Sequence, residues 1–523
     1  MKKIIAGLTA ALLVFGGVGV MPKGYETYTA LLASADSFGD FDYHYLNDET
    51  IEISKYSGSE TEVTIPEAIN GTKVTSVDIW AFENCENIKS ITIPDSVTHI
   101  GYRAFSGCTS LADITIPENV KSIGEYAFEG TPWLAAQKEK GGFVIVNTVL
   151  VDANGCKGAV TVPEGVTDIA NWAFEYCEEL TEVKLPSTLK KIGDFAFYGC
   201  NELKSVTIPE GTQVIGDWAF EECARLEEVT IPKSVTSVCT KAFEGTPWLN
   251  AQREKDPLVI INNIVIDGTT CKGDVTIPSG IVRINNNAFE YNDELTALTL
   301  PESVTGIGNN AFYGCEGLKS ITLTDNVESI GESSFFGCKA LKEITLPKGL
   351  TKIEYNAFNG CESLTEVTIP SGVKVIDDWA FTECTALEKV TIPTSVREID
   401  MAAFDGCESL KSITVPKSVI KIEERGFGYY LDSSWSREKI PGFTVYGYAG
   451  TDAQRYAEEN GFTFVPLEDN SVFGDIDGDG DPNVDDVLLV QQFIAGWDIG
   501  IEEYLLDINS DGLVSVDDAI LIQ

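Results

Sequence analysis

Apolar residues recur along most of this chain with a period of 23 residues. One set of prolines keeps that step from Pro94 to Pro416, and one set of phenylalanines keeps it from Phe82 to Phe427. One unit reads LKSVTIPEGTQVIGDWAFEECAR and begins at Leu203. Its first residues alternate between apolar and polar, which predicts a short strand, and the proline ends that strand because it has no N–H to donate. A second apolar pair (V-x-x-I) and a closing A-F complete the unit.

No single unit could bury its apolar side alone, so we expect the units to stack into a solenoid with a continuous interior. Two of the repeat units are interrupted by inserts of similar sequence. The segment EGTPWLAAQKEK (129–140) recurs as EGTPWLNAQREK (244–255) after 115 residues, which is five units. Strand-like segments, FVIVNTVLVD and LVIINNIVID, follow the two copies. The sequence therefore indicates a duplicated block of five repeats, with inserts near 131–160 and 246–275.

The generalised unit, L-x-x-I-T-I-P-x-x-V-x-x-I-G-x-x-A-F-x-G-C, resembles the leucine-rich repeats of the BspA-like type, seen in many secreted bacterial surface proteins. The resemblance covers residues 51–427 and implies a β-rich leucine-rich-repeat solenoid, with a parallel sheet and 23-residue coils, which we place at 36–430. Residues 446–467 resemble the cap that often closes such arrays. A polar helix between two short strands would cover the exposed apolar end, so we place a cap at 431–466.

The N-terminus has the layout of a secretory signal peptide, with two lysines followed by a mostly apolar run from Ile4 to Val20. That run is shorter than the roughly 20 residues that a membrane-spanning helix needs. Small residues at 33–35 (Ala-Ser-Ala) suit cleavage, which assigns 1–35 to the signal peptide. No later segment could span a membrane, and we expect a secreted, extracellular protein.

The net charge of −44 argues against a nucleic-acid partner, because binding to a phosphate backbone depends on clustered Lys and Arg. The only histidines are His44 and His99, so histidine-dependent triads and His-rich metal sites have almost no material. A paired-carboxylate glycosidase site could lie among 81 acidic residues. Almost every residue from 51 to 427 already belongs to a repeat column, however, and we expect no enzymatic activity.

Cysteines also follow the repeat, since ten of the 13 stand in the 23-residue frame. Export favours disulfides, but neighbouring coils place equivalent side chains about 4.8 Å apart and parallel, whereas a disulfide needs converging side chains. We therefore predict buried thiols that pack as small apolar residues. The frame cysteines are Cys85, Cys108, Cys177, Cys200, Cys223, Cys315, Cys338, Cys361, Cys384 and Cys407.

Two further columns are candidates for binding. The first is the column of residues two positions before each phenylalanine of the repeat, which is often aromatic. Its rings could stack on sugar rings or anchor a protein, or they could simply pack along the coil edge. Its aromatic members are Trp80, Tyr126, Trp172, Phe195, Trp218 and Trp379. A threonine stands in the first strand of most units, with Lys184 as an exception. This column predicts an even, uncharged strip that faces solvent, is flanked by acids and lies on a concave binding face.

The C-terminal region contains two acidic loops 32 residues apart, DIDGDGDPNVDD from Asp475 and DINSDGLVSVDD from Asp507. Each matches a twelve-position calcium loop, with side-chain oxygens at positions 1, 3, 5, 9 and 12, a backbone carbonyl at 7 and glycine at 6 for the turn. We therefore predict two bound Ca²⁺ ions. The predicted ligands are Asp475, Asp477, Asp479, Asp481, Asn483 and Asp486 in the first loop, and Asp507, Asn509, Asp511, Leu513, Ser515 and Asp518 in the second.

A preceding helix is absent and position 12 is Asp, so residues 474–523 resemble a type I dockerin, a small all-α module that binds cohesin domains of cellulosome scaffolds. The resemblance implies a linker at 467–474, a dockerin at 475–523 and two orientations of binding. Pro482 departs from the family because it cannot donate a backbone bond at position 8, and the second helix ends at Gln523. The cohesin contacts implied are Val484, Asp485, Gln491, Gln492, Val516, Asp517 and Gln523.

Together these patterns predict an exported, non-catalytic cellulosome-associated protein. The dockerin would bind a scaffold cohesin in a calcium-dependent manner, and the solenoid would bind an unidentified protein or glycan, with an indirect role in polysaccharide degradation. The first alternative is a carbohydrate-binding component that uses the aromatic column to reach plant cell wall. The second alternative is a hydrolase or protease inhibitor.

Overall fold

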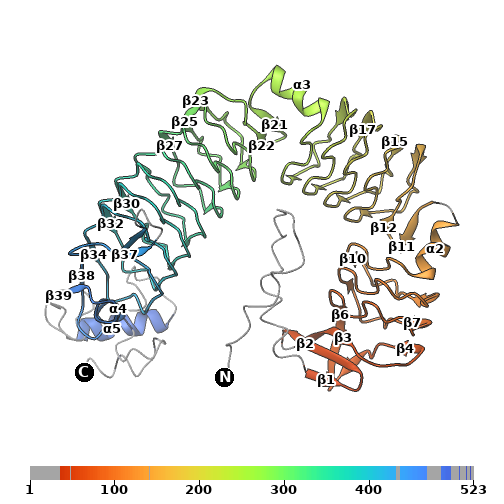
Figure 1. The fold of residues 1–523 in the computed structure, drawn as a ribbon, viewed down its shortest axis with the longest axis horizontal. Helices are drawn as coiled ribbons and strands as arrows, with labels where there is room; N and C mark the ends of the chain where they lie inside the picture. Colours follow the sequence, from red (N-terminus) through yellow and green to blue (C-terminus); the bar gives the residue numbers. More distant parts are fainter. Residues whose placement is uncertain are drawn as a thin grey trace. The chain divides into compact units, whose positions relative to one another are not determined.

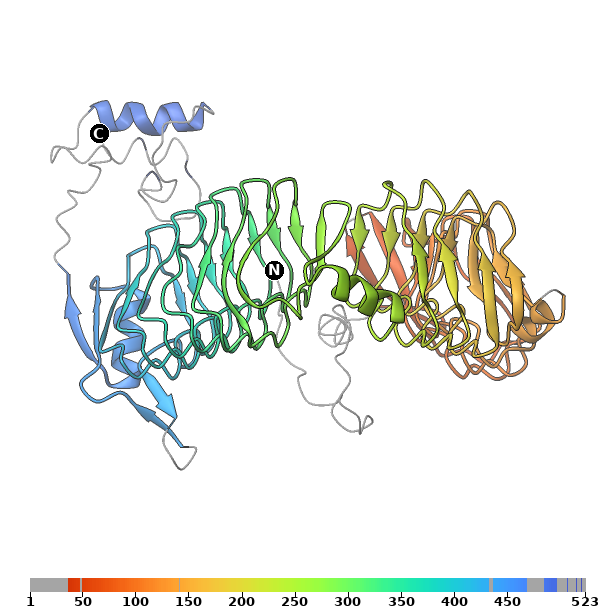
Figure 2. The same ribbon diagram turned by 90° about the horizontal axis from the view of Figure 1, so that it is seen from above.

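The computed structural model describes residues 36–47, 49–140, 142–431, 436–467 and 484–495, together with 506, 514 and 519. The predicted signal peptide and residues 468–474 of the predicted linker lie outside this set. The chain divides into two compact units, 1–252 and 253–523. Figure 1 labels their elements, Figure 2 shows the same colours from another side, and each unit is described by itself.

The first unit begins with an antiparallel meander. Strands β1 (Asp36–Phe38), β2 (Phe41–Asn47) and β3 (Thr50–Tyr56) pair in order, and β3 then pairs in parallel with β6 (Thr72–Val77). The meander thus adds strands to the edge of the first repeat coil. The short β4 (Glu62–Thr64) opens the stack of coils, and β5 (Ala68–Ile69) pairs antiparallel with β6.

Each repeat coil contributes two short strands. The first ends near the threonine and is called a threonine strand here. The second ends, in most coils, at the isoleucine of V-x-x-I and is called an isoleucine strand. Equivalent strands pair in parallel from coil to coil, which is the predicted solenoid pattern. The threonine strands of the first unit after β4 are β7 (Ser90–Thr92), β9 (Asp113–Thr115), β13 (Gly158–Thr161), β15 (Leu180–Lys184), β17 (Ser205–Thr207) and β19 (Glu228–Thr230). The isoleucine strands after β6 are β8 (His99–Ile100), β10 (Ser122–Ile123), β14 (Asp168–Ile169), β16 (Lys191–Ile192), β18 (Val214–Ile215) and β20 (Ser237–Val238).

Both inserts consist of a helix followed by a β-hairpin. In the first insert, α2 (Pro132–Lys138) precedes β11 (Val144–Val146) and β12 (Val149–Asp152), and in the second, α3 (Pro247–Lys255) precedes β21 (Val259–Ile261) and β22 (Ile264–Asp267). The hydroxyl of Thr131 accepts the Leu134 N–H at 3.1 Å, and a proline follows each capping threonine, where a missing N–H costs nothing. Each hairpin then supplies one isoleucine strand to the stack.

In the second unit the same coils continue. Its threonine strands are β23 (Gly273–Thr276), β25 (Leu295–Thr299), β27 (Ser320–Thr322), β30 (Glu366–Thr368), β32 (Lys389–Thr391) and β34 (Ser412–Thr414). Its isoleucine strands after β22 are β24 (Arg283–Ile284), β26 (Gly306–Ile307), β28 (Ser329–Ile330), β29 (Lys352–Ile353), β31 (Val375–Ile376), β33 (Glu398–Ile399) and β35 (Lys421–Ile422).

The predicted cap region closes this stack. A hairpin of β36 (Tyr429–Leu431) and β37 (Arg437–Lys439) is followed by β38 (Thr444–Gly447), α4 (Asp452–Asn460) and β39 (Thr463–Pro466). β38 and β39 extend the sheet of β34, and α4 packs beside them (Figure 1). The hydroxyl of buried Tyr456 donates to the Phe427 carbonyl at 2.8 Å, which joins the helix to the last frame phenylalanine.

The core of each unit contains a column of stacked phenylalanines. From Phe289 to Phe404, successive ring centroids lie 5.1 to 5.3 Å apart, the spacing of neighbouring coils. Beside this column run the frame cysteines, and all 13 cysteines are free. The prediction of unpaired thiols is confirmed, although Cys85 is only half-buried.

Candidate functional site

The exposed threonines of the threonine strands, with Lys184 in the same column, form rows across the paired strands of each unit and are together called the threonine strip. Cross-strand partners align them directly, as in Thr207 with Thr230 and Thr368 with Thr391. Their neighbours on either side along the strand point inward and are mostly buried, because side chains alternate across a strand. The members of the strip are Thr64, Thr92, Thr115, Thr161, Lys184, Thr207, Thr230, Thr276, Thr299, Thr322, Thr345, Thr368, Thr391 and Thr414.

Carboxylates border the threonine strip on the same face. The residue two positions before each strip residue points the same way, and in many coils it is an exposed acid. A surface of hydroxyl groups beside carboxylates favours partners that carry basic and hydrogen-bonding groups. These acids are Glu62, Asp113, Glu182, Glu228, Asp274, Glu343 and Glu366.

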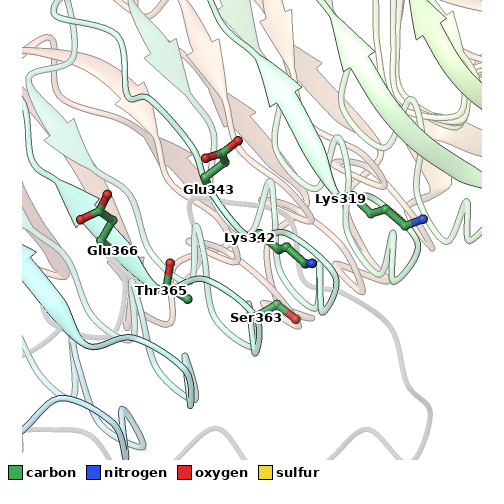
Figure 3. A pocket seen from close by; sticks show the side chains of 6 residues that line it. All are labelled: Lys319, Lys342, Glu343, Ser363, Thr365 and Glu366. Atoms are coloured by element: carbon green, nitrogen blue, oxygen red, sulfur yellow. The ribbon is translucent and has the colours of Figure 1, made fainter.

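One shallow polar depression lies on this surface in the second unit (Figure 3). It is found where the pairing of the threonine strands weakens, because Glu343 pairs with Ser320 of the preceding coil through an isolated bridge and not through a full strand. Its two glutamates lie on one side and its two lysines on the other, and among its lining residues no nucleophile is paired with a base. The depression is lined by Lys319, Lys342, Glu343, Ser363, Thr365 and Glu366.

The aromatic column adopts a backbone conformation that the sequence did not predict. Each member has a left-handed backbone, with φ of 61° at Trp172 and 51° at Trp218. Glycine is the residue that usually adopts such positive φ values. The rings of Trp172, Phe195 and Trp218 stack with centroids 3.9 and 4.9 Å apart. Because a sugar ring needs an open aromatic face, this stack favours the packing interpretation of the column over sugar binding.

A half-buried acidic pair lies beside the aromatic column next to the first insert. The Tyr126 hydroxyl donates to Glu175 Oε2 at 2.7 Å, and the Arg103 guanidinium lies 5.4 Å from the Tyr126 ring centroid. Burial, together with the negative charge of Glu175, raises the pKa of Glu125 to about 8. A protonated Glu125 carboxyl can therefore persist here at neutral pH.

The structure also gathers residues that the sequence left unassigned. His44 Nε2 lies 3.1 Å from Glu52 Oε2 and 3.9 Å from Asp78 Oδ2, and all three side chains are buried. The hydrogen bond with Glu52 raises the pKa of His44, whereas burial lowers the pKa of His99. Little in the sequence indicated this cluster, because two of its three residues, His44 and Glu52, belong to the meander and not to columns of the 23-residue repeat.

Most of the predicted calcium and cohesin-binding residues lie outside the described residues. The exception is helix α5 (Val484–Ile494), in which Gln491 is exposed and Gln492 is half-buried. Val487 and Val490 of this helix pack against Leu506 and Ala519 in a small buried apolar cluster. Val487 and Ala519 are 32 residues apart, the offset between the two acidic loops, so equivalent positions of the two motifs share one core.

Comparisons with known proteins identify the family of the repeat region. The family model described as "BspA type Leucine rich repeat region" matches residues 42–138, 155–268, 259–388 and 305–433. Because these matches cover more than half of the sequence, the chain belongs to the family of BspA-type leucine-rich-repeat proteins. Repeat proteins of this type serve in protein–protein interaction or adhesion and are typically surface or secreted proteins. None of the curated proteins matches the chain.

Solved structures of similar proteins include a leucine rich cell surface protein from Faecalibacterium prausnitzii. It is 30% identical, and the match covers 68% of this chain and 94% of that one, with a TM-score of 0.31. A leucine-rich repeat protein from Bacteroides ovatus is 27% identical over 73% of this chain and 95% of its own, with a TM-score of 0.32. Within the described part of this chain, no helix has the length and apolarity to cross a bilayer.

Proposed function

We propose that this protein is an exported, non-catalytic binding protein whose threonine strip receives a protein ligand. The observation that supports this proposal is the exposure of every residue of the strip, with direct register between neighbours wherever the threonine strands pair. Rigid, evenly spaced hydroxyl groups can bind an extended partner with little loss of conformational freedom, because the strands are already ordered.

The chemistry of the border indicates the kind of ligand. Acids such as Glu228 and Glu366 flank the threonines, and the whole chain carries a net charge of −44. A basic protein segment would complement this surface and would associate faster at low ionic strength. The proposed ligand is therefore a polypeptide with a basic binding face.

The test is a selection from a displayed random-peptide library against the full chain, with the Thr207→Arg/Thr230→Arg variant as comparison. We expect the selected peptides to be basic and to lose at least about tenfold in affinity on that variant, since two arginines repel them and block the strip. The matched control is Gln213→Arg/Thr236→Arg, which places the same charges on exposed positions beside the isoleucine strands of the same coils. Peptides that are acidic, or that bind the strip variant as well as the control, would refute the proposed ligand.

We further propose that residues 475–523 form a calcium-dependent dockerin that binds a cohesin. Support comes from the two matching acidic loops, from the start of α5 at Val484 directly after the ninth loop position, and from the shared apolar cluster. Carboxylate, amide and hydroxyl oxygens are the donors that Ca²⁺ prefers, so the residues present suit this ion. When bound, Ca²⁺ would hold the oxygens of each loop together and so order a module with little core of its own.

In this proposal each loop supplies one ion site. The first would use the side chains of Asp475, Asp477, Asp479, Asn483 and Asp486 with the carbonyl of Asp481, and the second those of Asp507, Asn509, Asp511, Ser515 and Asp518 with the carbonyl of Leu513. Cohesin contacts would come from Val484, Asp485, Gln491 and Gln492 in the first half, and from Val516, Asp517 and Gln523 in the second.

The experiment is binding of the full chain to a panel of purified type I cohesin modules, with Ca²⁺ and with a chelator. We expect at least one cohesin to bind only with Ca²⁺ and to be lost in the Asp475→Ala/Asp507→Ala variant. Asp113→Asn, a substitution on the acidic border of the threonine strip, is the control that should bind normally. Absence of any calcium-dependent binding across the panel would refute the dockerin proposal and would leave the threonine-strip proposal standing.

A further inference from the structure

Both histidines of the chain lie in one row across four strands of the first unit. His44 on β2 pairs directly with Glu52 on β3, Glu52 pairs with Ser76 on β6, and Ser76 pairs with His99 on β8. Direct partners in neighbouring strands present their side chains on the same face of the sheet. The two histidines, 55 residues apart in sequence, therefore share one face.

At one end of this row, three ligand-type side chains converge. Asp78, just beyond the end of β6, joins His44 and Glu52, and one nitrogen or oxygen atom from each lies within 4.8 Å of the other two. The side chains are less than a tenth exposed, with residue exposures of 6% for His44, 4% for Glu52 and 2% for Asp78. An imidazole and two carboxylates in such a small buried volume carry excess negative charge, which either a proton or a bound cation can neutralise.

The separations suit the first coordination shell of a small divalent ion. Zinc binds imidazole nitrogen and carboxylate oxygen at about 2.0 to 2.2 Å, so two ligands in tetrahedral geometry lie roughly 3.4 Å apart. The two distances from His44 Nε2, 3.1 Å to Glu52 Oε2 and 3.9 Å to Asp78 Oδ2, fall on either side of that value.

The second oxygen of each carboxylate has a partner that orients the group. The Ser76 hydroxyl donates to Glu52 Oε1 at 2.6 Å, and the Ile79 backbone N–H donates to Asp78 Oδ1 at 2.6 Å. The oxygens that face His44 are therefore Glu52 Oε2 and Asp78 Oδ2. Outer contacts of this kind are usual around protein metal sites, because they fix the direction of each ligand.

We propose that His44 Nε2, Glu52 Oε2 and Asp78 Oδ2 bind one divalent transition-metal cation of the zinc class. The ion would join the meander strands β2 and β3 to the end of β6 and so fasten the meander to the first repeat coil. The fourth position would be filled by water, since His99 is not among the converging ligands. This site is separate from the proposed calcium loops in both residues and ligand type.

The first test is spectroscopic titration of the full chain with Co²⁺. Excess Ca²⁺ is present so that sites made only of oxygen ligands are already occupied. We expect one equivalent to give the visible absorption of a four-coordinate ion without a thiolate charge-transfer band, and Zn²⁺ to displace it. Glu52→Gln and His44→Gln should abolish this binding, and Ser76→Ala should weaken it about tenfold or more. His99→Gln, the other histidine of the row, and Asp400→Asn, in the half-buried acidic group of Asp377, Asp378 and Asp400, are controls that should bind normally.

A second measurement needs no substitution at the site. With histidine ring carbons labelled, the two histidines give two ring signals, and His99→Gln assigns them. We expect equimolar Zn²⁺ to move the His44 signal and to leave the His99 signal nearly in place. The proposal is overturned if neither signal moves with Zn²⁺, or if Co²⁺ binding is the same in wild type, His44→Gln and Glu52→Gln. Either result would mean that the cluster is a buried imidazole–carboxylate ion pair and not a metal site.

Discussion

The sulfur of Cys384 lies 3.2 Å from the carbonyl oxygen of Phe358 in the preceding coil. The same carbonyl accepts the backbone N–H of Cys361 in its own coil at 3.2 Å. The carbonyls of Phe312, Phe335 and Phe381 likewise accept one backbone N–H within their own coil and one thiol from the next coil. The cysteine column is thus a ladder of weak hydrogen bonds that joins the coils without covalent links.

We expect all 13 cysteines to be reduced and mostly unreactive in the native protein. Burial raises the pKa of Cys108 and Cys315 to about 12, so little thiolate exists to attack an alkylating reagent near neutral pH. Mass spectrometry after iodoacetamide, without reductant, should show few adducts on the native chain and 13 after denaturation. Pairs of cysteines that stay unmodified in denaturant would reveal disulfides and contradict this prediction.

Removal of one ring from the phenylalanine column should destabilise its unit strongly. Phe358 is 1% exposed and stacks on Phe335 and Phe381, so Phe358→Ala leaves a cavity that costs about 3 to 5 kcal/mol of unfolding free energy. Phe336→Ala, at a half-buried ring that stacks on Tyr313, should cost clearly less. Urea unfolding of both variants checks this, and equal losses would show that the column is no more important than the coil edge.

The stability of the first unit should fall as the pH rises from about 5 to about 8. The folded pKa of Glu125 is about 8, above its ordinary value of 4.5, so between these values the folded chain binds more protons than the unfolded chain. Burial similarly raises the pKa of Glu221 to about 7. Stability from both groups is therefore present at low pH and is lost on deprotonation.

Thermal unfolding at several pH values measures this effect. Glu125→Gln, which resembles the protonated acid, should flatten the loss, and addition of Glu221→Gln should flatten it further. Glu118→Gln, an exposed change on the same unit, should keep the wild-type profile. A Glu125→Gln profile that is as steep as the wild type would show that this carboxyl does not retain its proton.

The aromatic column should not bind polysaccharide through its stacked members. The ring of Phe195 lies between Trp172 and Trp218, so those faces are closed to a sugar. We expect the wild type, Trp172→Ala and Trp218→Ala to migrate alike in affinity gels that contain soluble glycans, and to show equal binding to insoluble ones. Retardation of the wild type that is lost in either variant would restore the carbohydrate-binding alternative.

The sequence by itself determined the solenoid, the threonine strip and the thiol column. These features repeat every 23 residues, and a repeated unit can bury its apolar side only against a copy of itself, so period and alternation were sufficient to predict them. The two inserts were visible for the same reason, because they recur at an offset of 115 residues, five times 23. The structure agrees, since Asn147 and Asn262 occupy matching hairpin turns with φ of 54°.

Tertiary structure alone decided two other features. The left-handed backbone at Trp172 and Trp218 depends on hydrogen bonds to the next coil, such as Trp218 N–H to the Thr240 carbonyl at 2.8 Å, which no local propensity indicates. The meeting of His44, Glu52 and Asp78 depends on the register of the meander, which contains bulges and lies outside the repeat. A shift of one residue there would turn His44 to the other face, so only the paired strands could bring these groups together.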